Sequence, residues 1–536
     1  MSDVIGSPAG LHAGAGVFTA AEPSVAWMLG GYGPPQPIAP SRTAMIWEGG
    51  TRTYAELRAH ALALASALRE HGLETGDRVV SHLFNRGEVF EIYFACAFAG
   101  LTLVPASFRA TAAELADVIR DVDARFVFTE AELAETAETA VAAARVDAHI
   151  VVLGGDEPGP AYEALLGSAP LPAALAPADP HVILFSSGTT GKPKGAELTH
   201  RNLLYYAVQQ AAMFPGYDRD MRTLVVPTLF NTGGLHDFTL PTFLVGGTVC
   251  IMPSRGWRPE RMAAYIDRWR VTHTIVFPTM FQPMLHADTE SPLPLDSLRV
   301  ILTGGEVCPA DLMRRVRERW PRIELIIGYG GTEAGGITMI GNAEIDRRPG
   351  SVGRAAPGQV FKIVTAGGRP AAVGETGEIW TTSPTVTRGY WNAPELTAAA
   401  LSDGWLRTGD LGYVDEDGFL YINGRVRDMI ISKGQNIYPA EIEGVLQEHP
   451  GIDQCAVVGV PDEEYGEMVV AVVVPRAGHA LTGADVVEFV RDRIASHKKP
   501  RHVLFRGELP VSVNNKVLKR ELAAEVAAEL TQADPH

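Results

Sequence analysis

A glycine- and hydroxyl-rich stretch, Ser186 to Gly195, combines the residue types that bind phosphate. Its glycines free the backbone to turn N–H groups toward an anion, its hydroxyls add donors, and its lysines add positive charge. The residues concerned are Ser186, Ser187, Gly188, Thr189, Thr190, Gly191, Lys192 and Lys194. An apolar run at 182–185 and a helix capped by Thr199 predict the order strand, phosphate loop, helix. The chemistry indicated is nucleotide binding.

This stretch is not a Walker A motif. Pro193 follows Gly191-Lys192, and no glycine stands five positions before Gly191, so the ordinary ATPase pattern does not fit. Taken alone, a loop of this composition is also typical of a surface linker. The remaining motifs must decide between these two interpretations.

Two further segments offer groups suited to a nucleotide and its metal ion. Gly304 and Gly305 end an apolar run beside Glu306 and would let a flat ligand approach the backbone, although a tight turn explains them equally well. In the stretch 329–333, Tyr-Gly-Gly-Thr-Glu, the ring can stack on a base and the threonine can bind an oxygen of a phosphate or carboxylate. The carboxylate of Glu333 can hold Mg²⁺.

In order and spacing, these segments resemble the motifs of the adenylate-forming enzymes, which include acyl-CoA synthetases, peptide-synthetase adenylation domains and beetle luciferases. The resemblance extends over about residues 43–525 and includes Thr-Gly-Asp at 408–410 and Gly-Arg-x-x-Asp at 424–428. It implies that ATP and AMP contact the phosphate loop and Gly304, Gly305, Glu306, Tyr329, Gly330, Asp410 and Arg425. It also implies a hinge at Arg427 and Asp428, and a coenzyme A tunnel at Lys433, Gly434 and Gln435.

The resemblance implies catalytic roles for Thr332, Glu333 and Lys516, with Glu333 as the metal ligand. Lys516 matches the lysine that bridges the substrate carboxylate and the α-phosphate, where a cation stabilises the charge of two anions that must meet. Asn515 stands where the family has glycine, and asparagine tolerates the left-handed backbone region better than most residues. Lys519 is the alternative if the alignment is shifted.

The implied acyl pocket contains Phe230, Asn231, Gly234, His236 and Gly331. Asn231 replaces a histidine that borders this pocket in many relatives. His236 either compensates for it or is a hydrogen-bonded histidine on a helix, and the second interpretation is preferred. Gly331 replaces a bulkier residue, which should widen the pocket. We therefore expect a bulky or branched apolar acid, such as a polycyclic, terpenoid or steroid-derived carboxylate.

Composition limits the partners of the chain. Among 536 residues, 46 Lys and Arg against 63 Asp and Glu give a net charge of −17, which argues against binding nucleic acid or anionic membranes. The four cysteines are widely separated and predict neither a zinc site nor a disulfide framework. No signal peptide or long apolar run is evident, so we expect a cytoplasmic protein without stable membrane insertion. A homodimer is left open.

The apolar runs predict an α/β fold. Helix and strand signals alternate over about residues 43–302, as in βαβ units on a mostly parallel sheet, and beyond about residue 350 glycine-rich alternating segments suit antiparallel strands. The expected domains are 1–426, with layered α/β subdomains and a small β-rich subdomain, and 427–536, a small mobile α+β lid.

The function implied by the resemblance is an AMP-forming acyl-CoA synthetase that uses ATP, Mg²⁺ and coenzyme A. Its partner would be a small carboxylic acid, activated as an acyl-adenylate before thiol attack. Two alternatives stay open: a free-standing ligase that loads a carrier protein, and a nucleotide-binding protein in which Asn231 and Asn515 have abolished turnover.

Overall fold

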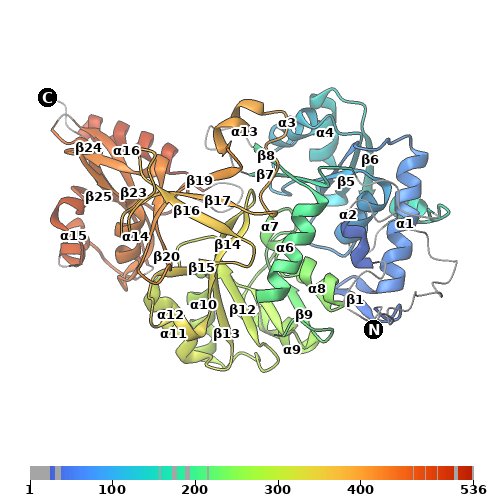
Figure 1. Cartoon of the computed structure of the whole chain (residues 1–536), viewed down its shortest axis with the longest axis horizontal. Helices are drawn as coiled ribbons and strands as arrows, with labels where there is room; N and C mark the ends of the chain where they lie inside the picture. The colour runs from blue at the N-terminus through green and yellow to red at the C-terminus, as the bar shows by residue number, and fades with distance from the viewer. Residues whose placement is uncertain are drawn as a thin grey trace, which may run out of the picture.

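The computed structural model describes residues 24–29, 38–155, 159–171, 178–186, 194–213, 216–462, 464–476, 478–491, 493–511 and 517–533. Within these ranges the strands form sheets of six, fourteen and five members. In Figure 1 the early, blue elements lie at one end of the long axis and the late, orange and red elements at the other. The described part of the chain contains no helix with the length and apolar character that a bilayer span requires.

The six-stranded sheet has the order β6-β5-β3-β4-β7-β8. Its strands are β3 (Arg78–His82), β4 (Thr102–Pro105), β5 (Phe126–Glu130), β6 (His149–Leu153), β7 (Val182–Ser186) and β8 (Lys194–Leu198). Helix α1 (Tyr54–Glu70) precedes these strands, and α2 (Glu88–Ala99), α3 (Ala112–Asp121), α4 (Ala134–Ala144) and α5 (Pro160–Leu166) lie between them in the chain. Capping boxes formed by Thr53 with Glu56 and by Thr111 with Glu114 set the starts of α1 and α3. The predicted βαβ rhythm is confirmed here.

The fourteen-stranded sheet begins as a parallel α/β layer. Its strands there are β1 (Thr43–Trp47), β9 (Arg222–Val225), β10 (Thr248–Ile251), β11 (His273–Ile275), β12 (Val300–Gly304) and β13 (Glu324–Gly331), with β2 (Gly50–Thr53) at the edge. The helices are α6 (His200–Met213), α7 (Thr232–Leu235), α8 (Thr239–Val245), α9 (Pro259–Trp269), α10 (Pro278–Glu290), α11 (Ala310–Arg319) and α12 (Asn342–Ile345). The carboxyl ends of β12 and β13 carry the predicted motifs at 304–306 and 329–333.

The predicted β-rich segment continues this same sheet. From β14 onward the strands pair in antiparallel fashion, and Tyr329 opposite Thr338 joins β14 to β13 of the α/β layer. The elements of the segment are β14 (Gly335–Ile340), β15 (Ser351–Ala355), β16 (Val360–Val364), β17 (Gly377–Thr382), α13 (Pro394–Ala400), β18 (Leu401–Ser402), β19 (Trp405–Val414) and β20 (Leu420–Arg425). The antiparallel prediction is confirmed, and the sheet shared with the α/β layer could not be predicted from alternation.

The five-stranded sheet lies C-terminal to η3 (Val426–Asp428). It contains β21 (Ile430–Ser432), β22 (Gln435–Ile437), β23 (Ile452–Asp462), β24 (Gly466–Pro475) and β25 (His502–Phe505), with helices α14 (Pro439–Gln447), α15 (Gly483–Arg491) and α16 (Lys519–Ala533). Ile442 of α14 and Val486 of α15 belong to one apolar cluster of this sheet, and Leu522 of α16 belongs to another. The predicted domain boundary at residue 427 stays a prediction.

Candidate functional site

The predicted phosphate loop lies between two antiparallel strands. β7 and β8 pair from Val182 opposite Leu198 to Ser186 opposite Lys194. The expectation that the loop leads directly into a helix is therefore wrong, because β8 intervenes before α6. Gly195 lies in β8, and its place is explained by packing: a Cβ there would lie 2.7 Å from Ile183 Cγ2.

The loop residues themselves and the predicted catalytic lysine fall outside the described ranges. This applies to Ser187, Gly188, Thr189, Thr190, Gly191, Lys192 and Lys516, and to the side chain of Ser186. Lys194 is described, and its Nζ lies 5.6 Å from the ring centre of Tyr390, a cation–π distance.

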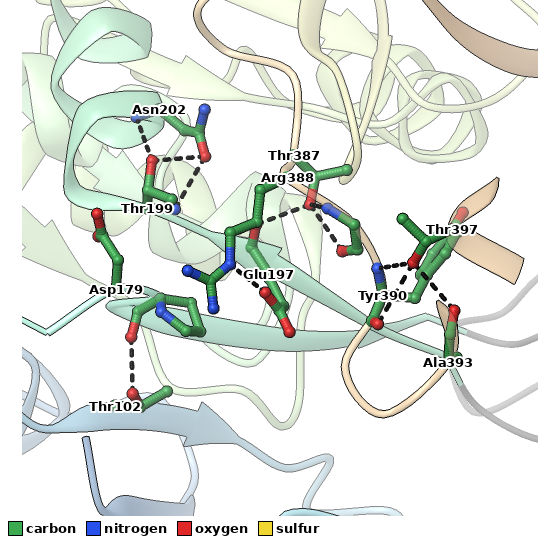
Figure 2. A network of polar contacts seen from close by, with 12 residues as sticks. Thr102, Asp179, Glu197, Thr199, Asn202, Thr387, Arg388, Tyr390, Ala393 and Thr397 are labelled. Carbon is green, nitrogen blue, oxygen red and sulfur yellow. Dashed lines mark hydrogen bonds and ion pairs between the residues drawn. The ribbon is translucent and has the colours of Figure 1, made fainter. Parts of the chain in front are cut away.

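Residues 387–390 form hydrogen bonds and an ion pair with β8, as Figure 2 shows. Thr387 Oγ1 donates a hydrogen bond to the Glu197 carbonyl oxygen at 2.7 Å, and the Glu197 N–H donates to the Gly389 carbonyl oxygen at 3.0 Å. The Arg388 guanidinium forms an ion pair with the Glu197 carboxylate. The strand that follows the phosphate loop is thus held by a segment much later in the chain.

The start of α6 is fixed to the same later segment. Thr199 Oγ1 accepts a hydrogen bond from the Asn202 N–H at 3.1 Å, so the predicted threonine cap is confirmed. The Asn202 amide nitrogen in turn donates to the carbonyl oxygens of Pro384 and Val386 at 2.7 and 2.8 Å. The carboxyl end of β8 and the start of α6 are therefore both positioned by residues 384–390.

Glu333 is oriented by this segment as well. The Tyr390 hydroxyl donates to Glu333 Oε1 at 3.0 Å, and the Thr387 N–H donates to the Glu333 carbonyl oxygen at 2.7 Å. Burial, together with the negative charge of Glu333, raises the pKa of Tyr390 above its usual value, so the phenol stays protonated and donates. Sequence reasoning missed Tyr390, because only the fold brings it to Glu333.

Three of the predicted nucleotide-binding side chains meet at Asp410. Tyr329 donates its hydroxyl hydrogen to Asp410 Oδ2 at 2.8 Å, and Arg425 Nε lies 3.1 Å from Asp410 Oδ1. Burial and the charge of Asp410 raise the pKa of Tyr329 well above its usual value. Beside them, the Thr232 hydroxyl donates to Thr332 Oγ1 at 3.4 Å. The structure therefore brings the motifs at 329–333, 408–410 and 424–425 together.

Close packing requires glycine at position 304, and a positive φ favours it at position 305. A Cβ on Gly304 would lie 2.2 Å from the Gly328 carbonyl oxygen, so only glycine fits beside β13. Gly305 has φ +76°, and a Cβ there would meet Phe277 at 3.7 Å. Glu306 Oε2 accepts a hydrogen bond from the Thr279 N–H at 3.4 Å.

The predicted acyl-pocket residues lie around α7. Phe230 is buried, and Asn231 donates its amide to Thr228 Oγ1 at 2.8 Å. A Cβ on Gly234 would lie 2.3 Å from the Thr228 carbonyl oxygen, which requires glycine. Gly331 is exposed, and the nearest atom to a Cβ there would be Glu333 Oε2 at 3.8 Å. The wider pocket expected from Gly331 stays a prediction.

The preferred interpretation of His236 is wrong. His236 follows α7 and is fully buried, and within the described residues neither of its ring nitrogens has a hydrogen-bond partner. Its ring packs instead near Tyr93, with ring centroids 6.0 Å apart. Burial lowers the pKa of His236 to about 3, so the imidazole is neutral. It is a desolvated core residue, and the spacing of residues in the sequence gives no sign of this.

The predicted hinge and tunnel residues follow Arg425 in the sequence. Arg427 Nε lies 3.3 Å from Asp428 Oδ1 within η3. Lys433 and Gly434 form the turn between β21 and β22 with φ values of +48° and +75°, followed by Gln435. The Lys433 ammonium pairs with Glu464 at 2.6 Å. The hinge residues lie in η3, directly after Arg425, which pairs with Asp410.

Lys519, the alternative to Lys516, is already paired. Its Nζ lies 2.6 Å from Glu443 Oε1, and the same carboxylate oxygen accepts the Val457 N–H at 2.7 Å. Lys519 therefore ties α16 to α14 and β23. This arrangement favours a structural part for Lys519 and leaves Lys516 as the candidate.

Comparisons with known proteins agree with this arrangement. The sequence profile of the family described as AMP-binding enzyme matches residues 38–391, and that of the AMP-binding enzyme C-terminal domain matches residues 441–516. A feruloyl-CoA synthase from Amycolatopsis sp is 37% identical over 488 residues, covering 90% of this chain and 96% of the relative. An indoleacetate–CoA ligase from Aromatoleum aromaticum is 36% identical over 496 residues, covering 91% of this chain and 96% of the relative.

Two solved structures of similar architecture both contain ATP. ATP-bound MatB from Rhodopseudomonas palustris superposes with a TM-score of 0.85 at 29% identity, covering 94% of this chain and 99% of that chain. An o-succinylbenzoate coenzyme A synthetase from Bacillus subtilis, in complex with ATP and magnesium ion, has a TM-score of 0.81 at 28% identity, covering 94% and 99%. With its motifs assembled around Asp410 and Glu333, the chain belongs to the AMP-binding enzyme family.

Proposed function

We propose that this protein is an acyl-CoA synthetase that converts a carboxylic acid and ATP to an acyl-adenylate, and then to a coenzyme A thioester. The observation that carries the proposal is the contact of Tyr329 and Arg425 with Asp410, beside Thr332 and Glu333. The strands that end there are parallel, and in such sheets ligands bind beyond the carboxyl ends of the strands.

In the first half-reaction, a carboxylate oxygen of the acid attacks the α-phosphorus of ATP. The bond from that phosphorus to the bridging oxygen breaks, and pyrophosphate leaves with the electron pair. Tyr329 would lie against the adenine, and Asp410 would accept the ribose hydroxyls, since a carboxylate has lone pairs beyond those taken by Tyr329 and Arg425. Lys516 would bridge the two anions, and the loop at 186–195 would hold the phosphates.

Glu333 is suited to hold Mg²⁺ on the ATP phosphates. Its Oε1 accepts the Tyr390 hydroxyl, which leaves Oε2 for the ion. The described residues hold no cluster of three or more potential metal ligands. A single carboxylate is nevertheless the usual protein contribution where Mg²⁺ sits on substrate phosphates. When bound, the ion would neutralise charge that develops on the leaving pyrophosphate.

In the second half-reaction, the coenzyme A thiolate attacks the acyl carbon and AMP leaves. We propose that residues 427–536 form a domain that turns about Arg427 and Asp428 for this step, and that Lys433, Gly434 and Gln435 then line the path of the thiol. The separate five-stranded sheet supports such a unit. Because the reaction consumes ATP and coenzyme A, we place the enzyme in the cytoplasm.

We propose an aromatic or other apolar acid as the substrate. The half-buried ring of Phe277 would be met at 3.9 Å by a Cβ on Gly233 and at 3.7 Å by one on Gly305, so the two glycines leave that ring uncovered. Relatives named for ferulate and indoleacetate support the same class. A relative named fatty acid–[acyl-carrier-protein] ligase, 35% identical, keeps the carrier-protein acceptor as the second candidate.

Pyrophosphate release tests the proposal. Wild type would be assayed with ATP, Mg²⁺ and a panel of aromatic, polycyclic and short aliphatic acids, with and without coenzyme A, and thioesters would be identified by mass. Lys516→Ala should lower the rate by about 100-fold or more, because it removes a cation from the transition state. Lys519→Ala is the matched control, and its rate of pyrophosphate release should stay within about threefold of the wild-type rate. Release by wild type without thioester would favour the carrier-loading ligase, and equal loss in both variants would contradict the role of Lys516.

A further inference from the structure

Residues 389–391 extend the six-stranded sheet at its edge. Their backbone pairs with β8 in antiparallel fashion, and the Trp391 N–H donates a hydrogen bond to the Gly195 carbonyl oxygen at 2.8 Å. Gly195 directly follows Lys194, the last residue to which a part in phosphate binding is assigned. The backbone at the end of the phosphate loop is therefore held by Trp391.

The side chains of Trp391 and Asn392 are anchored at the end of α3. Trp391 Nε1 and Asn392 Nδ2 both donate to the Asp121 carbonyl oxygen, at 3.1 and 2.8 Å. Asp121 is the last residue of α3, and the final carbonyl groups of a helix have no partner within the helix. Asn392 has φ +49°, a backbone region that asparagine tolerates better than most residues. The two donors therefore satisfy an acceptor that α3 itself leaves open.

The Trp391 ring adds an apolar contact and a cation–π contact. It packs against the buried cluster that contains Leu115 of α3 and Ile183 of β7. The guanidinium carbon of Arg78 lies 5.9 Å from the ring centre, and Arg78 also donates to the Val122 carbonyl oxygen just beyond α3. Hydrogen bonding, packing and charge thus all fix Trp391 to the layer of the six-stranded sheet.

The same segment reaches the other sheet. The Thr387 N–H donates to the Glu333 carbonyl oxygen at 2.7 Å, and the Tyr390 hydroxyl donates to Glu333 Oε1 at 3.0 Å. Glu333 follows β13 of the fourteen-stranded sheet, whereas Gly195 lies in β8 of the six-stranded sheet. The phosphate loop and the proposed metal ligand therefore come from different sheets, and residues 387–392 connect them.

We propose that Trp391 and Asn392 are positioning residues, whose anchor on Asp121 holds the end of the phosphate loop in place relative to Glu333. The proposal rests on the nucleotide chemistry proposed above and adds two residues to it. A site that is already arranged for the triphosphate and its Mg²⁺ loses less free energy to ordering when they bind. The proposed contacts of adenosine, at Tyr329 and Asp410, lie outside this set of bonds. Binding of MgATP should therefore depend on the anchor more than binding of AMP does.

Calorimetric titration with MgATP and with AMP tests this inference and requires no acid. The double variant Trp391→Phe, Asn392→Gly removes both donors, but it keeps an aromatic ring and a residue that accepts a positive φ. We expect the dissociation constant of MgATP to rise about tenfold, which is about 1.4 kcal/mol, and that of AMP to rise less than about threefold. Unchanged binding of MgATP, or equal weakening of both nucleotides, would overturn the inference.

A single variant and two controls guard against general damage to the fold. Asn392→Gly alone changes an exposed side chain, and the dissociation constant of MgATP should rise about threefold. Asp403→Gly replaces another exposed residue of positive φ, and Trp257→Phe removes an indole N–H that has no partner among the described residues. Both controls should bind the two nucleotides as wild type does. Weakening of MgATP binding in the controls to the same extent would contradict the role of the anchor.

Pyrophosphate release separates this inference from the ligase function. If wild type binds MgATP but releases no pyrophosphate with any acid, the ligase function fails, and the binding comparison still decides the role of Trp391 and Asn392. If wild type releases pyrophosphate and the double variant binds MgATP as tightly as wild type, the inference fails and the ligase stands. A wild-type protein that binds no MgATP would count against both.

Discussion

The Tyr390 hydroxyl lies 3.0 Å from Glu333 Oε1 and donates a hydrogen bond to it, while Lys194 Nζ lies 5.6 Å from the centre of the same ring. One tyrosine thus contacts both the residue that ends the phosphate loop and the proposed metal ligand. Its own place is fixed because its N–H donates to Thr397 Oγ1 at 2.9 Å (Figure 2). Tyr390 would therefore help to position both the nucleotide phosphates and the metal ion.

Tyr390→Phe should weaken the response to Mg²⁺. The change keeps the ring against Lys194 and removes the bond to Glu333, and a hydrogen bond to a charged group is worth about 1.5 kcal/mol at the lower end. We expect about a tenfold rise in the Mg²⁺ concentration for half-maximal pyrophosphate release. Tyr413→Phe, on the stacked pair Tyr413–Tyr421, is the control. An unchanged Mg²⁺ response in Tyr390→Phe would refute the positioning role of its hydroxyl.

Gly331→Met should narrow the acid site. A side chain there would start in open space, with Glu333 Oε2 at 3.8 Å as the nearest atom to its Cβ. Because it would fill the room proposed for the acid, kcat/KM for a fused-ring acid should drop about tenfold relative to that for a short aliphatic acid. Gly367→Met, at another open position, should leave this ratio unchanged. A parallel loss for large and small acids would show that Gly331 does not set the size limit.

Acid should destabilise the protein through three buried histidines. The rings of His181 and His200 stack at 4.4 Å. Burial lowers the pKa of His200 to about 4 and of His236 to about 3, and holds that of His181 well below its usual range. Between about pH 6.5 and 4 the unfolded chain binds protons that the native state does not, so the free energy of unfolding falls as pH falls, by up to about 1.4 kcal/mol per pH unit and group.

Urea unfolding at pH 7.5, 6 and 5 measures this loss. His236→Gln should reduce the slope of unfolding free energy against pH by about one group's share. His497→Gln, at an exposed position, should leave the slope as in wild type. The same slope in His236→Gln as in wild type would mean that His236 is not a source of the acid sensitivity.

The sequence predicted the elements whose signals are local. The Thr199 cap and the alternation of helices and strands over about residues 43–302 follow from capping chemistry and apolar runs, and both are present. The strand β8 was missed because its first two residues, Lys194 and Gly195, were assigned to the phosphate loop, and its pairing with β7 is a contact between segments.

The sequence predicts which motifs belong to the site, but it does not predict which of their side chains are in contact. Tyr329, Asp410 and Arg425 could be named from their spacing and a family likeness, and they do meet. Tyr390 could not be named, because a lone tyrosine carries no local sign of its partners. Desolvation decides the protonation state of His236. It depends on all the residues packed around the ring and cannot be predicted from the sequence near position 236.

The fate of a labelled carboxylate oxygen tests the central claim of adenylate formation most directly. The enzyme would be supplied with ATP, Mg²⁺, coenzyme A and an accepted acid carrying ¹⁸O in both carboxylate oxygens, and the products would be weighed by mass spectrometry. Attack on the α-phosphorus followed by thiol attack on the acyl carbon leaves one labelled oxygen on each AMP and one in each thioester. Label in inorganic phosphate, with ADP as the nucleotide product, would mean an acyl-phosphate route and would contradict the account.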